Sequence, residues 1–226
     1  PFSSRGRDFT YSIINNGTME AEALQDKGLS AGVIDVSNNT PIQSTVRAPA
    51  GRQSGEIINN GTIRTNQGNA INVAQNGDLA ITNNGRIEGA GGINAYQAIV
   101  KIADAGGQPL TRIFNSGQGV IDLKQAPPPP GADPDDIYDV TAIFVTGGDF
   151  DINNAGRITV DGLAGVGIRA ASLIDVTDFV RSTQAITIDN SGEILTTGRE
   201  SIGIEVERAS YGIETAPNQQ TVIRNS

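Results

Sequence analysis

A short motif built on asparagine and glycine recurs along the whole chain and constrains its fold more than any other feature. The motif is an Asn, then Asn, Ser or Ala, then Gly, any residue, and finally Ile or Met. Complete copies begin at Asn15, Asn59, Asn83, Asn154 and Asn190, a copy with one extra residue begins at Asn115, and Asn225 begins a further one. Self-similarity of this kind is typical of an architecture in which one supersecondary unit is stacked many times.

The shortest repeat shows what one unit contains. It spans 24 residues, from Asn59 to Asn83, and holds three short segments in which apolar and polar residues alternate, at 62–65, 70–73 and 79–82. Alternation with period two predicts half-buried strands, and the Asn and Gly residues between the segments favour turns. Three strands separated by turns predict one triangular rung of a parallel β-helix. Neither a propeller blade of about 40 residues nor a leucine-rich repeat fits this spacing.

The predicted fold class is therefore all-β, a single-stranded parallel β-helix in which residues 1–226 form one segment. With strands about 4.8 Å apart, roughly six to seven rungs would make a rod about 30 Å long. The middle strands of successive rungs are expected to form stacked apolar columns. We assign these strands to 33–36, 70–73, 98–102, 142–145, 167–170 and 203–206.

Most of the other repeats are longer than 24 residues, which predicts insertions at the corners of the rungs. The clearest insertion is residues 125–137, which contain four consecutive prolines and then Asp133, Asp135 and Asp136. Because proline cannot donate a hydrogen bond to a sheet, this segment is expected to leave the stack. Further candidate insertions are residues 46–54, 175–183 and 207–219.

The motif residues have a structural explanation. An Asn side chain carries a donor and an acceptor, so equivalent Asn residues one rung apart can hydrogen-bond along the stack. The predicted ladder consists of Asn15, Asn59, Asn83, Asn115, Asn154, Asn190 and Asn225. We expect the Gly two positions later to supply a positive φ at the corner. The Ile or Met that closes the motif then returns the chain to the core.

Composition excludes several classes of function. The net charge of −9 opposes binding to nucleic acid, which requires clustered Lys and Arg. The chain has no Cys and no apolar run near the roughly 20 residues of a membrane-spanning helix. It also has no His, so a Ser-His-Asp triad and His-ligated zinc are ruled out. No cofactor is expected. Because the last repeat is cut at Ser226, we expect a fragment of a longer, exported protein.

The repeats resemble those of bacterial autotransporter passenger domains, which commonly have the form Ile-x-Asn-x-Gly-x-Ile followed by a Gly-Ala-Ile-type strand. That pattern stands here at Ile57–Ile63 followed by Asn69–Ile71, and again at Ile152–Ile158 and Ile186–Ile194. The resemblance covers nearly the whole chain. It implies a right-handed β-helix, secretion across the outer membrane of a Gram-negative bacterium, and a role in adhesion, auto-aggregation or biofilm formation. It also implies an outer-membrane barrel that anchors the parent protein and is absent from this chain.

Carboxylate chemistry is the enzymatic alternative, since some parallel β-helices are polysaccharide lyases or glycoside hydrolases that use paired acids. Asp149 and Asp151 are spaced to point to the same face of a strand, and Asp133, Asp135 and Asp136 form a second acidic group. Either group could hold calcium. The simpler interpretation of both is solvated charge on a strand or loop edge.

Two other sets of residues are candidates for the surface. Exposed aromatic rings could stack on sugars, and the candidates are Tyr96, Tyr138, Tyr211, Phe144 and Phe179. A mixed charged run comprises Glu200, Glu205, Glu207 and Arg208 and is expected to be a solvated face. We therefore expect a non-enzymatic structural segment that contacts a second copy, a host or matrix protein, or a glycan.

Overall fold

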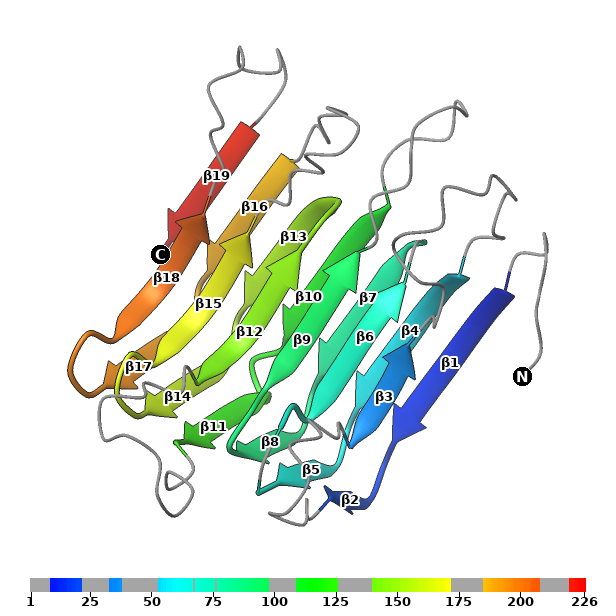
Figure 1. Ribbon diagram of the computed structural model, residues 1–226, viewed down its shortest axis with the longest axis horizontal. Coiled ribbons are helices and arrows are strands. Elements are labelled where there is room, and N and C mark those ends of the chain that lie inside the picture. Colours follow the sequence, from blue (N-terminus) through cyan, green and yellow to red (C-terminus); the bar gives the residue numbers. More distant parts are fainter. Residues whose placement is uncertain are drawn as a thin grey trace, which may run out of the picture.

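The computed structural model describes residues 9–21, 33–37, 53–66, 68–75, 77–97, 109–125, 140–171, 185–207 and 220–226. All the regular structure in these ranges is β-strand, and the strands form three parallel sheets (Figure 1). The described residues contain no helix that could cross a membrane. The all-β class predicted from the alternating sequence pattern is confirmed.

Sheet A has seven strands, in the order β1 (Phe9–Asn15), β4 (Gln53–Asn59), β7 (Leu79–Asn83), β10 (Leu110–Asn115), β13 (Asp149–Asn154), β16 (Ala185–Asn190) and β19 (Gln220–Asn225). Sheet B has six, in the order β2 (Thr18–Ala21), β5 (Thr62–Thr65), β8 (Arg86–Gly89), β11 (Val120–Lys124), β14 (Arg157–Asp161) and β17 (Glu193–Thr197). Sheet C also has six, in the order β3 (Ile34–Ser37), β6 (Ile71–Gln75), β9 (Ile93–Gln97), β12 (Thr141–Thr146), β15 (Val166–Ala171) and β18 (Ile202–Glu207).

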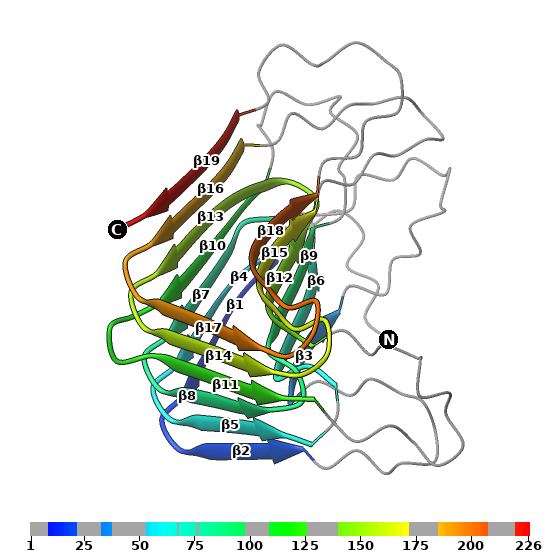
Figure 2. The same cartoon turned by 90° about the vertical axis from the view of Figure 1, so that its left-hand side faces the viewer.

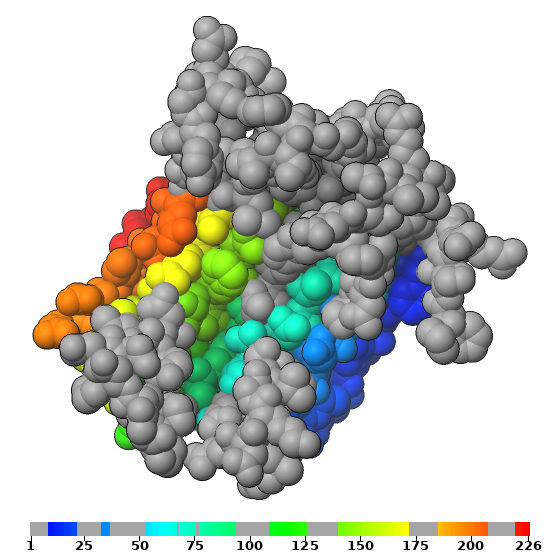
Figure 3. Space-filling model, in the orientation of Figure 1, coloured from blue at the N-terminus to red at the C-terminus, as the bar shows by residue number. Residues whose placement is uncertain are grey.

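The chain visits the three sheets in strict rotation. Strand β1 lies in sheet A, β2 in sheet B and β3 in sheet C, and β4 then returns to sheet A beside β1. We call each set of three consecutive strands a level. The described residues form six complete levels, and β19 begins a seventh. Figure 2 shows the sheets facing a common interior, and Figure 3 shows the levels following one another from blue to orange.

Equivalent positions of the repeats lie in register, and this places one column of isoleucines at the centre of sheet A and another at the centre of sheet C. In sheet A the column runs through Ile13, Ile57, Ile81, Ile113, Ile152 and Ile188. In sheet C it runs through Ile34, Ile71, Ile93, Ile143, Ile168 and Ile204. Most of these side chains are completely buried. Each level therefore extends the same narrow core, which explains why the chain needs few aromatic residues.

Side chains at or just before the starts of sheet A strands accept hydrogen bonds from the backbone of the next level. The carboxylate of Asp78 accepts the backbone N–H of Leu110 at 2.9 Å, and that of Asp149 accepts the N–H of Ala185 at 2.8 Å. The hydroxyl of Ser54 accepts the N–H of Asp78 at 3.2 Å. These contacts satisfy backbone donors where each strand enters the sheet.

The assignment of residues 98–102 to a middle strand is wrong. Strand β9 is formed by Ile93–Gln97, with Ile93 in register with both Ile71 and Ile143. Residues 98–102 are more apolar than this strand but lie outside the described residues. Register with the levels on either side, rather than local hydrophobicity, selects the segment that pairs.

Two predicted insertion boundaries also need correction. Gln53 and Ser54 belong to β4 rather than to an insertion. Gln125 belongs to the stack, because its N–H donates to the carbonyl of Asp161 at 2.8 Å and its Oε1 accepts the N–H of Leu163 at 2.8 Å. Residues 126–137 and 175–183 lie outside the described residues, as do all but Glu207 of the expected insertion at 207–219.

Tyr11 crosses the interior at the first two levels. Its ring occupies the space over Gly55, where a Cβ would lie only 1.9 Å from the ring. Its hydroxyl donates to Oε1 of the buried Gln75 at 2.6 Å, and the Gln75 amide donates in turn to the carbonyls of Gly77 and Asp78 at 3.0 and 2.9 Å. Burial raises the pKa of Tyr11 to about 12.

The raised pKa of Tyr11 predicts a loss of stability in alkali. Above about pH 10, a tyrosine in the unfolded chain releases its proton while Tyr11 in the folded chain keeps it. The free energy of unfolding should therefore fall between about pH 10 and pH 12. Tyrosinate absorbance should show a late phase that is missing in Tyr11→Phe, whose urea midpoint should fall less over the same range. Titration of every tyrosine near pH 10 in the folded protein would contradict this expectation.

Candidate functional site

Seven buried or corner asparagines are joined by side-chain hydrogen bonds along the whole stack. Each Nδ2 donates to the Oδ1 of the next level, at distances between 2.6 and 2.8 Å. The chain of bonds runs through Asn15, Asn59, Asn83, Asn115, Asn154, Asn190 and Asn225. We call this set the inner asparagine ladder. Its members are the last residues of the sheet A strands, where the chain turns toward sheet B.

The inner asparagine ladder also satisfies backbone groups at the corner. The amide nitrogens of Asn15, Asn59 and Asn83 each donate a second hydrogen bond, to the carbonyls of Thr62, Arg86 and Val120 at 3.2 to 3.3 Å. All the amides point in one direction along the stack. Aligned hydrogen bonds polarise one another in a buried site, so the ladder is a cooperative structural element.

The explanation proposed for the motif glycines is wrong. Positive φ angles occur at Gly68, Gly89, Gly147, Gly148 and Gly198, and none of these is a motif glycine. Glycine is required instead because the backbones of neighbouring levels leave no room for a Cβ atom. A Cβ on Gly61 would lie 1.9 Å from the carbonyl oxygen of Gly17, and one on Gly85 would lie 2.0 Å from that of Gly61. The same oxygens accept hydrogen bonds from Thr62 and Arg86, so the backbones of successive levels lie in direct contact.

A second row of asparagines lies on the outside of the same corner. The side chain of Asn60 donates to Asn16 at 2.9 Å, and that of Asn84 donates to Asn60 at 2.9 Å. We call Asn16, Asn60 and Asn84 the outer asparagine row. This row was not predicted from the sequence, although Asn fills the second motif position in these three copies and only Ser or Ala fills it later.

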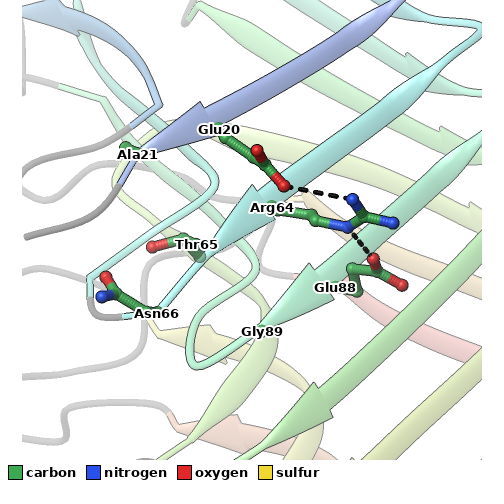
Figure 4. A pocket seen from close by; sticks show the side chains of 7 residues that line it. All are labelled: Glu20, Ala21, Arg64, Thr65, Asn66, Glu88 and Gly89. Atoms are coloured by element: carbon green, nitrogen blue, oxygen red, sulfur yellow. Dashed lines mark hydrogen bonds and ion pairs between the residues drawn. The ribbon is translucent and has the colours of Figure 1, made fainter.

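The outer face of sheet B carries a network of charges that joins four levels. Arg64 pairs with Glu20 at 3.1 Å and with Glu88, and Arg86 pairs with Glu88 and with Asp122 at 2.5 Å. Figure 4 shows Arg64 between the two glutamates at a shallow depression on this face. Both guanidinium groups are already occupied by carboxylates, so the depression has no free cation to offer an anionic ligand.

Glu88 is the centre of this network. Hydrogen bonds from Arg64, and then from Arg86, lower the pKa of its carboxyl group despite some desolvation. Because the pKa of Glu88 is lower in the folded chain than in the unfolded chain, the network stabilises the folded protein at pH values above about 4.3, the pKa of Glu in the unfolded chain. This contribution to the free energy of unfolding is lost as the pH falls.

Glu88→Gln should therefore lower the free energy of unfolding at neutral pH by at most about 1 kcal/mol, because the pairs are at the surface. The difference from the wild-type protein should shrink in high salt and below about pH 4. Urea unfolding at two salt concentrations measures it. Glu193→Gln is the control, since within the described ranges Glu193 makes one exposed ion pair, with Arg157 at 3.3 Å. An equal effect of the two substitutions would argue against a network.

The outer face of sheet A exposes several apolar side chains. Ile14 and Phe114 occupy one outward column with Ile58 and Thr82 between them, and they are 54% and 41% exposed. Farther along this column, Arg224 pairs with Asp189 at 2.9 Å. This face is regular, and it exposes both apolar and charged groups.

The structure gives Asp149 a structural contact. Burial raises the pKa of its carboxyl group, and the hydrogen bond from the Ala185 N–H offsets part of this effect. Asp151, two residues along the same strand, is exposed. Among the described residues there is no group of three or more acidic side chains placed to hold a metal ion. Asp133, Asp135 and Asp136 lie outside the described residues.

The remaining surface candidates are distributed over sheet C and its surroundings. Phe144 is half-buried on the outer face, in register with Arg169. Arg169 pairs with Glu205 at 2.6 Å and Glu207 at 3.5 Å, so two members of the predicted charged run join adjacent levels. Glu200 has a backbone φ of 65°, and its Oε1 lies 3.6 Å from the Nε of Arg199. The side chain of Tyr96, and all of Tyr138, Phe179, Arg208 and Tyr211, lie outside the described parts.

Three kinds of feature could therefore carry a function: the inner asparagine ladder, the outer asparagine row and the outer faces of the three sheets. Comparison with known proteins adds no relative: no family model, no curated protein and no solved structure matches the chain.

Proposed function

We propose that residues 1–226 form one segment of a right-handed, single-stranded parallel β-helix, with about six to seven triangular rungs. The rotation of the chain through three parallel sheets supports this fold. The handedness follows the general rule that a connection between parallel strands of one sheet is right-handed in about 98% of cases. The insertion predicted at residues 125–137 would leave the stack at a corner directly after Gln125.

The proposed role is structural and non-enzymatic: the segment mediates adhesion, auto-aggregation or biofilm formation. The inner asparagine ladder carries this proposal. The most frequent motif of the sequence forms this ladder and holds the levels together. The side chains on the outer faces therefore lie in regular columns, in which neighbouring levels are about 4.8 Å apart. A rigid surface with repeated groups suits weak contacts made many times over, whose combined strength exceeds that of any one contact.

The partners we propose are a second copy of the chain, a host or matrix protein, or a glycan. The proposed location is the surface of a Gram-negative bacterium, or its surroundings, with the parent protein anchored by a separate outer-membrane barrel. The support for this location is the likeness of the Ile-x-Asn-x-Gly-x-Ile repeats to autotransporter passenger domains.

The test is to coat beads with the purified chain, and to measure clumping and binding to an array of glycans and matrix proteins. Two variants probe different faces: Phe114→Ser removes the exposed ring from sheet A, and Arg64→Gln breaks the charge network of sheet B. We expect wild-type beads to clump or to capture a defined ligand. At least one variant should lose this property while keeping its urea midpoint close to that of the wild-type protein.

The same preparation tests the enzymatic alternative. Release of reducing or unsaturated sugar ends from a panel of polysaccharides, without clumping or ligand capture, would overturn the structural role. In that case, Asp149→Asn and Asp151→Asn would be the first variants to assay. Asp149→Asn needs a parallel stability measurement, because this carboxylate also supports the start of β16.

A further inference from the structure

Each member of the outer asparagine row is followed directly by glycine, as Asn16–Gly17, Asn60–Gly61 and Asn84–Gly85. Asn–Gly is the pair in which an asparagine side chain deamidates most readily, because glycine has no side chain to obstruct its own backbone nitrogen. The chain has a fourth such pair, Asn76–Gly77, whose asparagine lies outside the described residues. The structure places the three pairs of the outer asparagine row in different surroundings.

The reaction consumes one water and releases one ammonia. The glycine nitrogen loses its proton and attacks the Asn Cγ, which forms a C–N bond and closes a five-membered succinimide. The Cγ–Nδ2 bond breaks, and Nδ2 leaves as ammonia with its own two hydrogens and one further proton, equivalent to the one that the glycine N–H has lost. Water then opens the ring on either side, which gives aspartate or isoaspartate. The side chain must therefore rotate freely, and the glycine N–H must be available.

Asn60 is held against this rotation at both ends. Its Nδ2 donates to Asn16 and its Oδ1 accepts from Asn84, both at 2.9 Å. Its glycine is also confined, because Gly61 lies against the backbone of Gly17. Both hydrogen bonds must open before the Asn60 side chain can reach the glycine nitrogen.

Asn84 is restrained in a different way. Its leaving group, Nδ2, donates to Asn60, and the nucleophile, the N–H of Gly85, donates to the carbonyl of Asn59 at 3.0 Å. The backbone of Gly85 lies against that of Gly61. The leaving group and the nucleophile of Asn84 deamidation are thus both held in hydrogen bonds.

Asn16 is the least restrained member of the row, because its side chain is held only at Oδ1, which accepts from the Asn60 amide at 2.9 Å. It is exposed, and its Nδ2 donates to no described residue. Gly17 has no neighbouring atom within 4 Å of the place where a Cβ would stand. The N–H of Gly17 donates only to the side chain of Asn15, at 3.1 Å.

We propose that Asn16 is a site of spontaneous deamidation, and that the outer asparagine row suppresses the same reaction at Asn60 and Asn84. Deamidation would also alter the structure. Isoaspartate at position 16 inserts an extra methylene into the backbone just before Gly17, whose carbonyl accepts the N–H of Thr62 at 2.8 Å. The modification therefore loosens β1 and β2 from the second level and leaves the later levels intact.

The experiment is to incubate the whole chain in mildly alkaline buffer at physiological temperature and to follow each site by peptide mapping and mass spectrometry. We expect Asn60 to react roughly tenfold or more slowly than Asn16, because the Asn60 side chain is held at both Nδ2 and Oδ1 whereas that of Asn16 is held only at Oδ1. Asn84 should also lag behind Asn16. In urea, where the row is absent, the three sites should react at similar rates. Equal rates in the folded chain, or faster reaction at Asn60, would overturn the proposal.

A variant tests whether the row itself protects Asn60. Asn16→Ser combined with Asn84→Ser removes both partners of Asn60 and uses the residue that the chain has at the equivalent positions 116 and 191. We expect deamidation at Asn60 to accelerate severalfold while the urea midpoint stays close to that of the wild-type protein. An unchanged rate at Asn60 in a folded double variant would show that the row gives no protection.

Discussion

Replacing Asn83 with leucine should lower the free energy of unfolding by about 2–4 kcal/mol, although leucine is apolar and similar in size. Asn83 is 1% exposed and accepts from Asn59 at 2.8 Å while donating to Asn115 at 2.8 Å and to the carbonyl of Val120 at 3.3 Å. Its loss leaves the Oδ1 of the buried Asn115 and the part-buried carbonyl of Val120 without this donor. Buried polar groups that lose a partner cost more than the hydrogen bond itself contributes.

The matched control is Asn84→Leu, the same substitution one residue away. Asn84 belongs to the outer asparagine row, and its side chain donates a solvent-exposed hydrogen bond to Asn60. We expect its loss to cost less than about 1 kcal/mol. Urea unfolding compares the two variants, and hydrogen exchange should show the damage from Asn83→Leu concentrated at β7 and β10. Similar losses for both variants would mean that the inner asparagine ladder is no stronger than a surface contact.

A subtler substitution, Asn83→Asp, separates hydrogen bonding from shape. An ionised carboxylate can still accept from Asn59, but it then faces the Oδ1 of Asn115 and the carbonyl of Val120, which are both acceptors. Burial and these acceptors should raise its folded pKa above the unfolded value of about 3.9. The protonated form is therefore favoured in the fold, and the deficit relative to the wild-type protein should grow as the pH rises above about 4. A deficit independent of pH would contradict this mechanism.

The positions of most strands could be predicted because their side chains alternate between core and solvent. Segments 62–65 and 79–82 fall within β5 and β7, and both have a buried residue at every second position. Strand β9 could not be found in this way. Its position depends on register with β6 and β12, and the more apolar segment after it has the stronger local signal.

The contacts between levels were harder to predict than the strands. The asparagine positions follow from counting repeats, because an Asn at the same place in every repeat must meet its equivalents once the repeats stack. The charge network does not follow in this way, because Glu20, Arg64 and Glu88 come together only when the register of β2, β5 and β8 is known. The role of the motif glycines was mistaken because glycine permits both a positive φ and close backbone contact, and sequence alone does not separate these causes.

Gly85→Ala should test which of these causes is correct, and we expect it to cost about 3 kcal/mol. The backbone of Gly85 does not have a positive φ, so alanine is not excluded by conformation. Its methyl group would lie 2.0 Å from the carbonyl oxygen of Gly61, which accepts the N–H of Arg86 at 2.8 Å. The second and third levels must separate at this corner to admit the methyl group, and this strains the hydrogen bond that joins them.

Gly17→Ala places the same substitution at the same motif position, where no atom lies within 4 Å of the new methyl group. We expect its effect on the free energy of unfolding to stay within about 0.5 kcal/mol, since alanine also restricts the unfolded chain. Urea midpoints of the two variants measure the difference, and hydrogen exchange should locate the loosening at β5 and β8 in Gly85→Ala alone. Equal destabilisation by the two substitutions would point to a shared conformational demand on the motif glycines. A large difference would establish that close contact between successive levels is what requires glycine at this corner.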